Sequence, residues 1–190
     1  MLQKQIHREK SLGLTPADVP LDALPTIELD QDDIEQVVRL AEKRNGSAAD
    51  EGVVFGGLDS LTSHQIGLLG ELAVAKLYGI NVDTGAYQGG DDGKDHSLLD
   101  LDIDVKTTAT TKVRRPELLV CAYKPLRADL YVRAHVIDWS ASSACVRIIG
   151  CASTEIVEEQ TPRCHPGSTK NYVVAPDEMT FLPLLDTSDC

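Results

Sequence analysis

The sequence predicts a mixed α/β fold, of the α+β kind, with a central mixed sheet flanked by helices. Two helical segments come first, a series of short strands follows, and a short helix with one last strand closes the chain. Helices and strands in this order are typical of α+β and mixed α/β domains. At 190 residues the chain suits a single hydrophobic core. We therefore expect one sheet of about four or five strands.

Residues 1–60 are predicted to form an N-terminal arm and a helical extension, and residues 61–190 the main domain. The first 30 or so residues contain three prolines and no sustained hydrophobic period, which is typical of an extended arm. Apolar residues then recur at helical spacing from Ile34 to Ala41, behind acidic residues that suit a first turn. Asn45-Gly46 is expected to end this helix.

A second helix is predicted over residues 64–79, HQIGLLGELAVAKLYG. Ser63 is expected to cap its start, and Gly79 to take the left-handed conformation just after its end. Gly67 and Gly70 inside the helix would each cost about 1 kcal/mol relative to alanine. Their presence indicates that the helix backbone packs closely against a sheet.

The segment SLLDLDIDVKTT, residues 97–108, carries the clearest strand pattern. Apolar and charged residues alternate strictly along it, which is the period of a strand with one face in the core. Asp104 and Lys106 are therefore expected to point the same way. Further strands are predicted at residues 80–88, 117–123, 129–138, 144–152 and 172–175, and a short helix near residues 154–160.

The composition is that of a soluble globular protein, with 42% hydrophobic and 25% charged residues. No segment approaches the roughly 20 apolar residues of a membrane span, and MLQKQIHREK lacks the apolar stretch of a signal peptide. We expect a cytoplasmic protein with no membrane partner. The five cysteines show no Cys-x-x-Cys spacing and are expected as reduced thiols. Zinc ligation by Cys151, Cys164 and His165 is the alternative, without the usual ligand spacing.

The formal net charge of −12 is unfavourable for a partner made of phosphates. A local basic cluster, Lys112, Arg114 and Arg115, offers one answer, and we expect these residues to contact a nucleic-acid backbone. A solvated face is the alternative reading of the same cluster. An acidic surface would also suit a salt-adapted organism, because salt screens repulsion between carboxylates and phosphates.

Asp104-Val105-Lys106 is the centre of the chemical prediction. Two converging carboxylates can hold Mg²⁺, and a lysine on the same strand face can stabilise charge developing on a phosphate. Asp95 precedes Asp104 by nine positions, a separation that lets a tight hairpin fold one back onto the other. Other aspartates compete for this second position, namely Asp91, Asp92 and Asp100.

Glu71 on a helix, then Asp95, then Asp104-x-Lys106 on a strand resembles the pattern of the PD-(D/E)XK nuclease superfamily, which includes type II restriction endonucleases and archaeal Holliday-junction resolvases. The resemblance is close over residues 64–110 and looser to about residue 185. It implies a restriction-endonuclease-like core, Asp95 and Asp104 as metal ligands, Lys106 as catalytic lysine, and Glu71 as a further metal-contacting or water-organising carboxylate. Lys94 stands where the family's nominal proline would be.

The resemblance thus implies an Mg²⁺-dependent nuclease, with Mn²⁺ able to substitute, that hydrolyses DNA phosphodiester bonds in repair, recombination, restriction or viral DNA processing. A homodimer is compatible with it. The alternative is a catalytically inactive protein of the same fold that binds nucleic acid or scaffolds a partner. Two further readings of the acidic run are the solvated face of an edge strand and a calcium loop, the latter disfavoured because Val105 follows the three alternating aspartates. Duplex, single-stranded and branched DNA, and RNA, all stay open as substrates.

Overall fold

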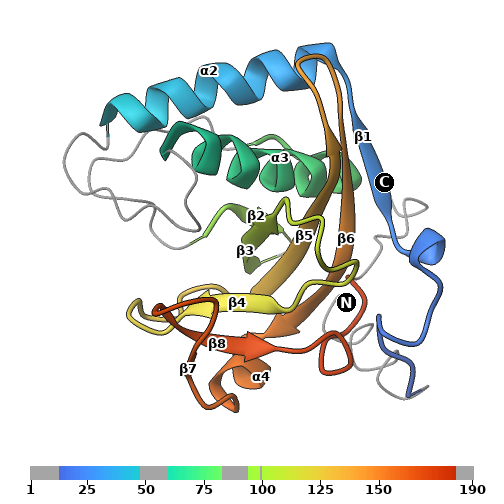
Figure 1. Ribbon diagram of the computed structural model, residues 1–190, viewed down its shortest axis with the longest axis vertical. Helices are drawn as coiled ribbons and strands as arrows, with labels where there is room; N and C mark the ends of the chain where they lie inside the picture. Colours follow the sequence, from blue (N-terminus) through green and yellow to red (C-terminus); the bar gives the residue numbers. More distant parts are fainter. Residues whose placement is uncertain (1–12, 48–59, 83–93, 99, 183–190) are drawn as a thin grey trace.

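The computed structural model describes residues 13–47, 60–82, 94–98 and 100–182. Its elements, in chain order, are η1 (Leu21–Ala23), β1 (Thr26–Leu29), α2 (Gln31–Ser47), α3 (Ser60–Tyr78), β2 (His96–Leu98), β3 (Leu101–Thr108), β4 (Leu118–Cys121), β5 (Leu130–Trp139), β6 (Ala144–Ser153), α4 (Thr154–Glu158), β7 (Arg163–Cys164) and β8 (Lys170–Val174). Figure 1 shows α2 and α3 layered on a curved sheet, with β4, β8 and α4 at the other end of the molecule. The predicted mixed α and β class is confirmed.

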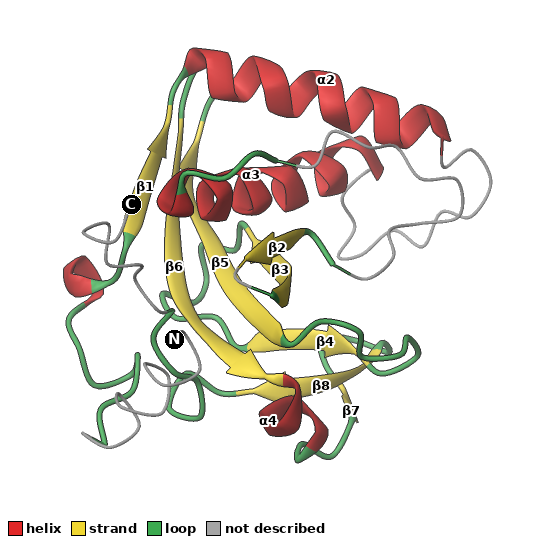
Figure 2. Ribbon diagram, turned by 180° about the vertical axis from the view of Figure 1, so that it is seen from behind, coloured by secondary structure: helices red, strands yellow, loops and turns green. Residues whose placement is uncertain are grey.

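The described strands form two sheets. The larger has the order β1-β6-β5-β3-β2 and the smaller the order β4-β8-β7. Strands β3 and β5 are parallel, whereas every other neighbouring pair is antiparallel. Two register shifts between β5 and β6 are bulges, which bend a strand pair and increase its twist. The long strands β5 and β6 accordingly curve from the helical layer toward the smaller sheet (Figure 2). The larger sheet has the expected size, and the smaller sheet was not predicted.

Helix α3 lies against the larger sheet, and α2 packs on α3. A Cβ atom at Gly70 would overlap Thr107 Oγ1 and lie 2.9 Å from its Cγ2, so the close helix–strand approach predicted at Gly70 is confirmed. Gly79 has a φ of 64°, the predicted left-handed conformation after the helix. The helix begins at Ser60, so the predicted cap at Ser63 was wrong and this residue lies inside the first turns.

The segment predicted as one strand is in fact a hairpin. Strand β2 pairs antiparallel with β3, and Asp100 in the turn between them has a φ of 66°. Aspartate is one of the few residues with a side chain that tolerates this conformation, which explains a turn without glycine. The predicted strands at 117–123, 129–138, 144–152 and 172–175 are present with shifted ends. Of the strand expected at residues 80–88, residues 80–82 are not in a strand and the rest lies outside the described residues.

Part of the region expected as an arm and extension belongs to the main core. Strand β1 pairs with β6 at the edge of the larger sheet, and Leu29, Ile34 and Val37 are buried in the same apolar cluster as α3. Strand β1 alternates polar and apolar residues, with Ile27 half-buried and Leu29 buried, but four residues are too few to mark a strand within a proline-containing segment. Within the described ranges, no helix is long and apolar enough to cross a membrane.

The larger sheet has a helical face and an opposite face. Alternate residues of β3 and β5, such as Ile103, Val105 and Val132, belong to the core beneath α3. The intervening residues face the other way, where Tyr131 joins a second apolar cluster formed with β4, β8 and α4. In-register residues of neighbouring strands share a face, so Asp104 lies beside Tyr131 and Lys106 beside Arg133 on this opposite face.

Candidate functional site

Asp104 and Lys106 lie on the same face of β3, as their spacing of two predicts. The Lys106 Nζ atom is 2.6 Å from Asp104 Oδ1, and the Asp104 side chain is only 9% exposed. Their apolar neighbours Ile103 and Val105 are buried on the helical face, which fixes the direction of the polar pair. A buried carboxylate and a half-buried ammonium are thereby held together at the centre of the sheet.

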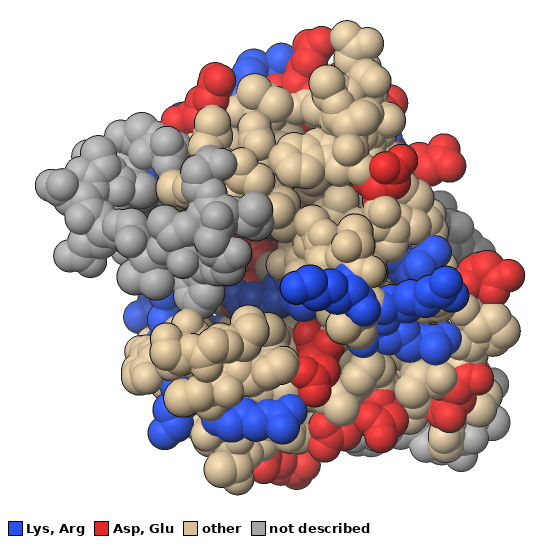
Figure 3. Space-filling model, viewed as in Figure 1, with Lys and Arg blue, Asp and Glu red and all other residues tan. Residues whose placement is uncertain are grey.

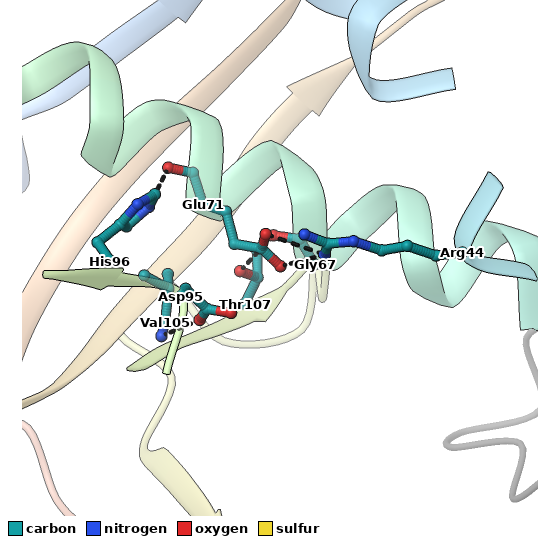
Figure 4. Close-up of polar contacts among 7 residues, drawn as sticks. All are labelled: Arg44, Gly67, Glu71, Asp95, His96, Val105 and Thr107. Carbon is teal, nitrogen blue, oxygen red and sulfur yellow. Dashed lines mark hydrogen bonds and ion pairs between the residues drawn. The ribbon is translucent and has the colours of Figure 1, made fainter. Parts of the chain in front are cut away.

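Asp95 lies at the edge of β3, just before β2 begins. Its backbone N–H donates to the Ile103 carbonyl at 2.8 Å, and its carboxylate Oδ2 accepts from the Val105 N–H at 2.6 Å. The Asp95 side chain thus takes the hydrogen-bonding place on β3 that a continued β2 would have occupied (Figure 4). The hairpin predicted from the nine-residue separation places Asp95 beside the 103–105 segment.

Glu71 follows the glycine at which α3 touches β3. Because the helix backbone lies so close to the strand there, the next side chain is carried to the same region, where it is 7% exposed. Both carboxylate oxygens accept hydrogen bonds from Nη1 of Arg44, each at 3.0 Å. The Glu71 backbone carbonyl is 2.9 Å from Nε2 of His96, which joins α3 to β2 (Figure 4).

The carboxylates affect one another electrostatically. Burial raises the pKa of Asp95 well above its ordinary value, and the negative charges of Glu71 and Asp104 raise it further. The hydrogen bond from Val105 N–H and the charge of Lys106 act in the opposite direction without reversing the shift. Three carboxylates therefore share one region with two cations, Lys106 and Arg44.

The carboxylate oxygens of the site are the kind of ligand that a hard cation such as Mg²⁺ prefers, but few of them are grouped together. Among the described residues, no three His, Cys, Asp or Glu side chains stand together as ligands of one ion. Glu71 is paired with Arg44 and Asp104 with Lys106. Within the described part of the chain, Asp95 accepts only from the Val105 N–H and is affected by the charges of both other carboxylates. Mg²⁺ commonly binds through one or two carboxylates and otherwise keeps water or phosphate oxygens as ligands. The pair Asp95 and Asp104 fits that pattern, and the predicted ligand Glu71 does not join it in this arrangement.

Arg133 on β5 is a further member of the site, beside Lys106 on β3. It is 5% exposed, its Nη1 donates to the Lys106 carbonyl at 3.1 Å, and its Nε has no hydrogen-bond partner among the described residues. Burial lowers the pKa of Arg133 to about 10, so the guanidinium stays charged at neutral pH. A buried cation therefore lies directly beside Lys106.

The predicted nucleic-acid contacts do not act as one cluster. Lys112 and Arg114 are exposed on the loop between β3 and β4, whereas Arg115 is half-buried and its Nη2 donates to the Val19 carbonyl. Figure 3 shows Lys and Arg side chains gathered in a band across the middle of one face, with acidic side chains recessed beside it. The band runs between the helical layer and the smaller sheet.

The structure distinguishes the predicted site from its alternatives, namely the other aspartates, a calcium loop and a zinc site. Asp100 is in the hairpin turn and exposed, while Asp91 and Asp92 lie outside the described residues. Asp102 accepts hydrogen bonds from Ser97 and Lys94, and the alternating aspartates lie on a turn and a strand and not in a calcium loop. The four described cysteines form no disulfide with one another, and no zinc-binding group forms among the described residues.

Comparison of the chain with protein-family models, with curated proteins and with solved structures gives no match. Function therefore has to be argued from the geometry of the site.

Proposed function

We propose that this protein is an Mg²⁺-dependent nuclease with a restriction-endonuclease-like core, and that it hydrolyses DNA phosphodiester bonds. The observation that carries the proposal is the joint position of Asp95, Asp104 and Lys106 around the edge and face of β3. The order of α3, the β2–β3 hairpin and the parallel neighbour β5 supports the proposed core.

Asp95 and Asp104 would hold the metal ion, with Mn²⁺ able to replace Mg²⁺. When bound, such an ion polarises a phosphodiester and lowers the pKa of a coordinated water. The raised pKa of Asp95 fits this role, because a carboxyl crowded by other carboxylates gains most when a cation arrives. Glu71 would support the water shell from α3, held in place by Arg44.

Lys106 would neutralise the phosphate or orient the attacking water. Its ammonium is already fixed by Asp104, so little side-chain freedom has to be lost when substrate binds. Arg133 beside it adds a second positive charge in a region of low dielectric, where charge stabilisation is strongest. Such fixed cations also offset, locally, the unfavourable net charge of −12.

The test compares Asp104→Asn and Lys106→Ala with the matched variants Asp32→Asn and Lys170→Ala, whose wild-type side chains are exposed away from the site. Labelled duplex, single-stranded and branched DNA, and RNA, are incubated with Mg²⁺ or Mn²⁺ at low and high salt. We expect the two site variants to lose at least about 100-fold in cleavage rate while keeping their melting temperature near that of the wild type. Cleavage that persists in both site variants ends the assignment.

A non-catalytic relative that binds nucleic acid or scaffolds a partner is the second candidate. One observation favours it: Glu71 is bound by Arg44 and the described residues form no three-ligand metal group. Calorimetric titration with Mg²⁺ and Mn²⁺ separates the two candidates. A nuclease should bind the ion and lose that binding in Asp104→Asn, whereas a binding protein should show little uptake in either form.

A further inference from the structure

An open pocket of about 490 Å³ lies beyond the carboxylates on the same side of the larger sheet. Its walls come from η1, from the loop that follows β3, and from β5 and β6. Its polar lining consists of Asp22, Thr110, Thr111, Arg114, His135 and Arg147. No role in the proposed chemistry has been given to His135 or Arg147.

Strand register connects this pocket to the candidate site. Lys106 is the neighbour of Arg133, and two residues further along β5 His135 is the neighbour of both Thr108 and Arg147. Residues two apart on a strand share a face and lie roughly 7 Å apart. The pocket is therefore the next position along the face that carries Lys106.

The pocket lining includes two arginines and two buried nitrogen atoms without hydrogen-bond partners in the described ranges. His135 is 5% exposed, its Nε2 is 2.8 Å from the Thr110 carbonyl, and its Nδ1 is buried with no hydrogen bond, although the Arg114 carbonyl lies near enough to affect its pKa. The Nε of Arg147 is likewise buried and unpartnered among the described residues.

Within the described part of the chain, neither Arg114 nor Arg147 forms an ion pair. Asp22 is the one acidic residue of the described lining. A buried donor without a partner, such as Arg147 Nε, costs free energy, and beside it two arginines without ion pairs line one hollow, an arrangement that suits an anion.

We propose that this pocket binds a phosphate group, held by the guanidinium groups of Arg114 and Arg147 with the threonine hydroxyls completing its contacts and His135 lying beside it. Guanidinium groups present paired donors that match phosphate oxygens, and threonine hydroxyls add neutral donors. That the phosphate belongs to a nucleic-acid strand rests on the proposed function. In that case the pocket holds a phosphate of the strand whose cleaved bond lies at Lys106, and so sets the register of the strand.

The main test measures binding by fluorescence anisotropy in an Asp104→Asn background, which prevents cleavage. Arg147→Gln is compared with Arg39→Gln, a matched control on α2 whose side chain is 67% exposed. Two otherwise identical single-stranded oligonucleotides serve as probes, one with a 5′-phosphate and one without. We expect Arg147→Gln to reduce the slope of log K against log salt by about 0.7, and Arg39→Gln to leave it unchanged.

The two probes separate the sources of the phosphate. An equal loss with both indicates an internal phosphodiester, and a loss confined to the phosphorylated probe indicates a terminal phosphate. Arg114→Gln, at an exposed position, repeats the test should Arg147→Gln unfold. The proposal is overturned if neither Arg147→Gln nor Arg114→Gln changes the slope of log K against log salt more than Arg39→Gln does.

A third arm keeps this result apart from the proposed function. Inorganic phosphate is titrated into the wild type while the His135 ring is followed by NMR, with His135→Gln assigning its signals. If the chain binds neither oligonucleotide, the nuclease proposal fails, and the pocket then stands or falls on this arm alone. A shift of the His135 signals supports a phosphate site, and unchanged signals at millimolar phosphate refute it.

Discussion

Asp95 has two roles at the level of a single residue. One carboxylate oxygen completes the hydrogen bonding of β3 through the Val105 N–H, a structural task that a neutral amide could also perform. The same group stands near Glu71 and Asp104, and that crowding is unfavourable for its charged form. Stability and the proposed metal binding would therefore place opposite demands on one side chain, as is common at functional sites.

Asp95→Asn is expected to stabilise the metal-free protein at neutral pH. Because the folded-state pKa of Asp95 is raised above 3.8, its contribution to stability is fully present below that pH. The contribution is lost as the pH rises through the folded pKa, since ionisation then adds a third crowded carboxylate. Asparagine cannot ionise, and its carbonyl oxygen still accepts from Val105. Thermal unfolding in EDTA from pH 4 to pH 8 should show the variant gaining on the wild type as the pH rises.

The control for this experiment is Asp32→Asn, an exposed aspartate on α2, which should show no such trend. A stability difference between Asp95→Asn and the wild type that is the same at every pH would contradict a raised pKa of Asp95 in the folded protein, because such a shift makes the difference depend on pH.

Some site residues were predictable one by one, and others were not. Asp104 and Lys106 follow from strict alternation, and Asp95 from a hairpin separation, because both patterns are local in sequence. Arg44 is 27 positions from Glu71 on another helix, and no local pattern marks it. Arg133 lies in β5, whose first seven residues are all buried. Its sequence context therefore gave no sign that this arginine lies beside Lys106.

At the level of elements, the contact between α3 and β3 determines how the site is assembled. Gly70 allows the helix to approach Thr107, whose hydroxyl also donates to the Gly67 carbonyl at 3.3 Å. This approach brings Glu71 toward the edge of β3. Gly70 predicted the contact correctly, whereas a Cβ atom at Gly67 would meet only Glu71 Oε1, at 3.9 Å, so the prediction from Gly67 is not confirmed.

Gly70→Ala should destabilise the protein by about 1–3 kcal/mol, even though alanine favours helix formation. The new methyl group would overlap the Thr107 side chain, which is itself fixed within the strand. Gly67→Ala is the matched control on the same helix, since a Cβ there meets only Glu71 Oε1, at 3.9 Å. It should leave stability unchanged or raise it by up to about 1 kcal/mol. The free energies of unfolding of both variants are measured in urea. Equal changes in Gly70→Ala and Gly67→Ala would contradict close packing at Gly70.

Elements with a long regular pattern were predictable, as were the apolar strands β4 and β8, whereas the shortest strands and the pairing of β4 with β8 were not. The helix α2 and the ten-residue strands β5 and β6 have enough residues to show their period. Strands β1 and β7 have four and two residues, and their pairing depends on partners far along the chain. The smaller sheet was missed for the same reason, since β4 leaves its chain neighbours β3 and β5 to pair with β8.

At the level of the whole molecule, charge is distributed unevenly. The protein carries 30 acidic and 18 basic residues, yet a band of basic side chains crosses one face. Lys106, Arg114, Arg133 and Arg147 belong to three strands and a loop, and only strand register brings them to one side. Net charge could be read from the sequence, whereas this local excess of positive charge could not.

Salt should therefore stabilise the folded protein. With a net charge of −12, folding brings like charges together, and this repulsion weakens as the Debye length falls from about 10 Å at 0.1 M to about 3 Å at 1 M salt. The ion pairs that salt would weaken include exposed ones such as Arg39 with Glu35, and such pairs contribute little. We expect the melting temperature in EDTA at pH 7 to rise by a few degrees between 0.1 and 1 M KCl. This rise corresponds to a gain of about 1 kcal/mol in the free energy of unfolding.

The same series near pH 4.7, the isoelectric point, provides the control. There the net charge vanishes, so the repulsion that salt relieves at pH 7 is absent and the melting temperature should change much less. An equal rise at both pH values would assign the effect to general salting-out of apolar surface. A fall in the melting temperature at pH 7 would mean that specific ion pairs outweigh the net repulsion. The acidic surface would then be stabilised by local ion pairs and not by the screening of repulsion by salt.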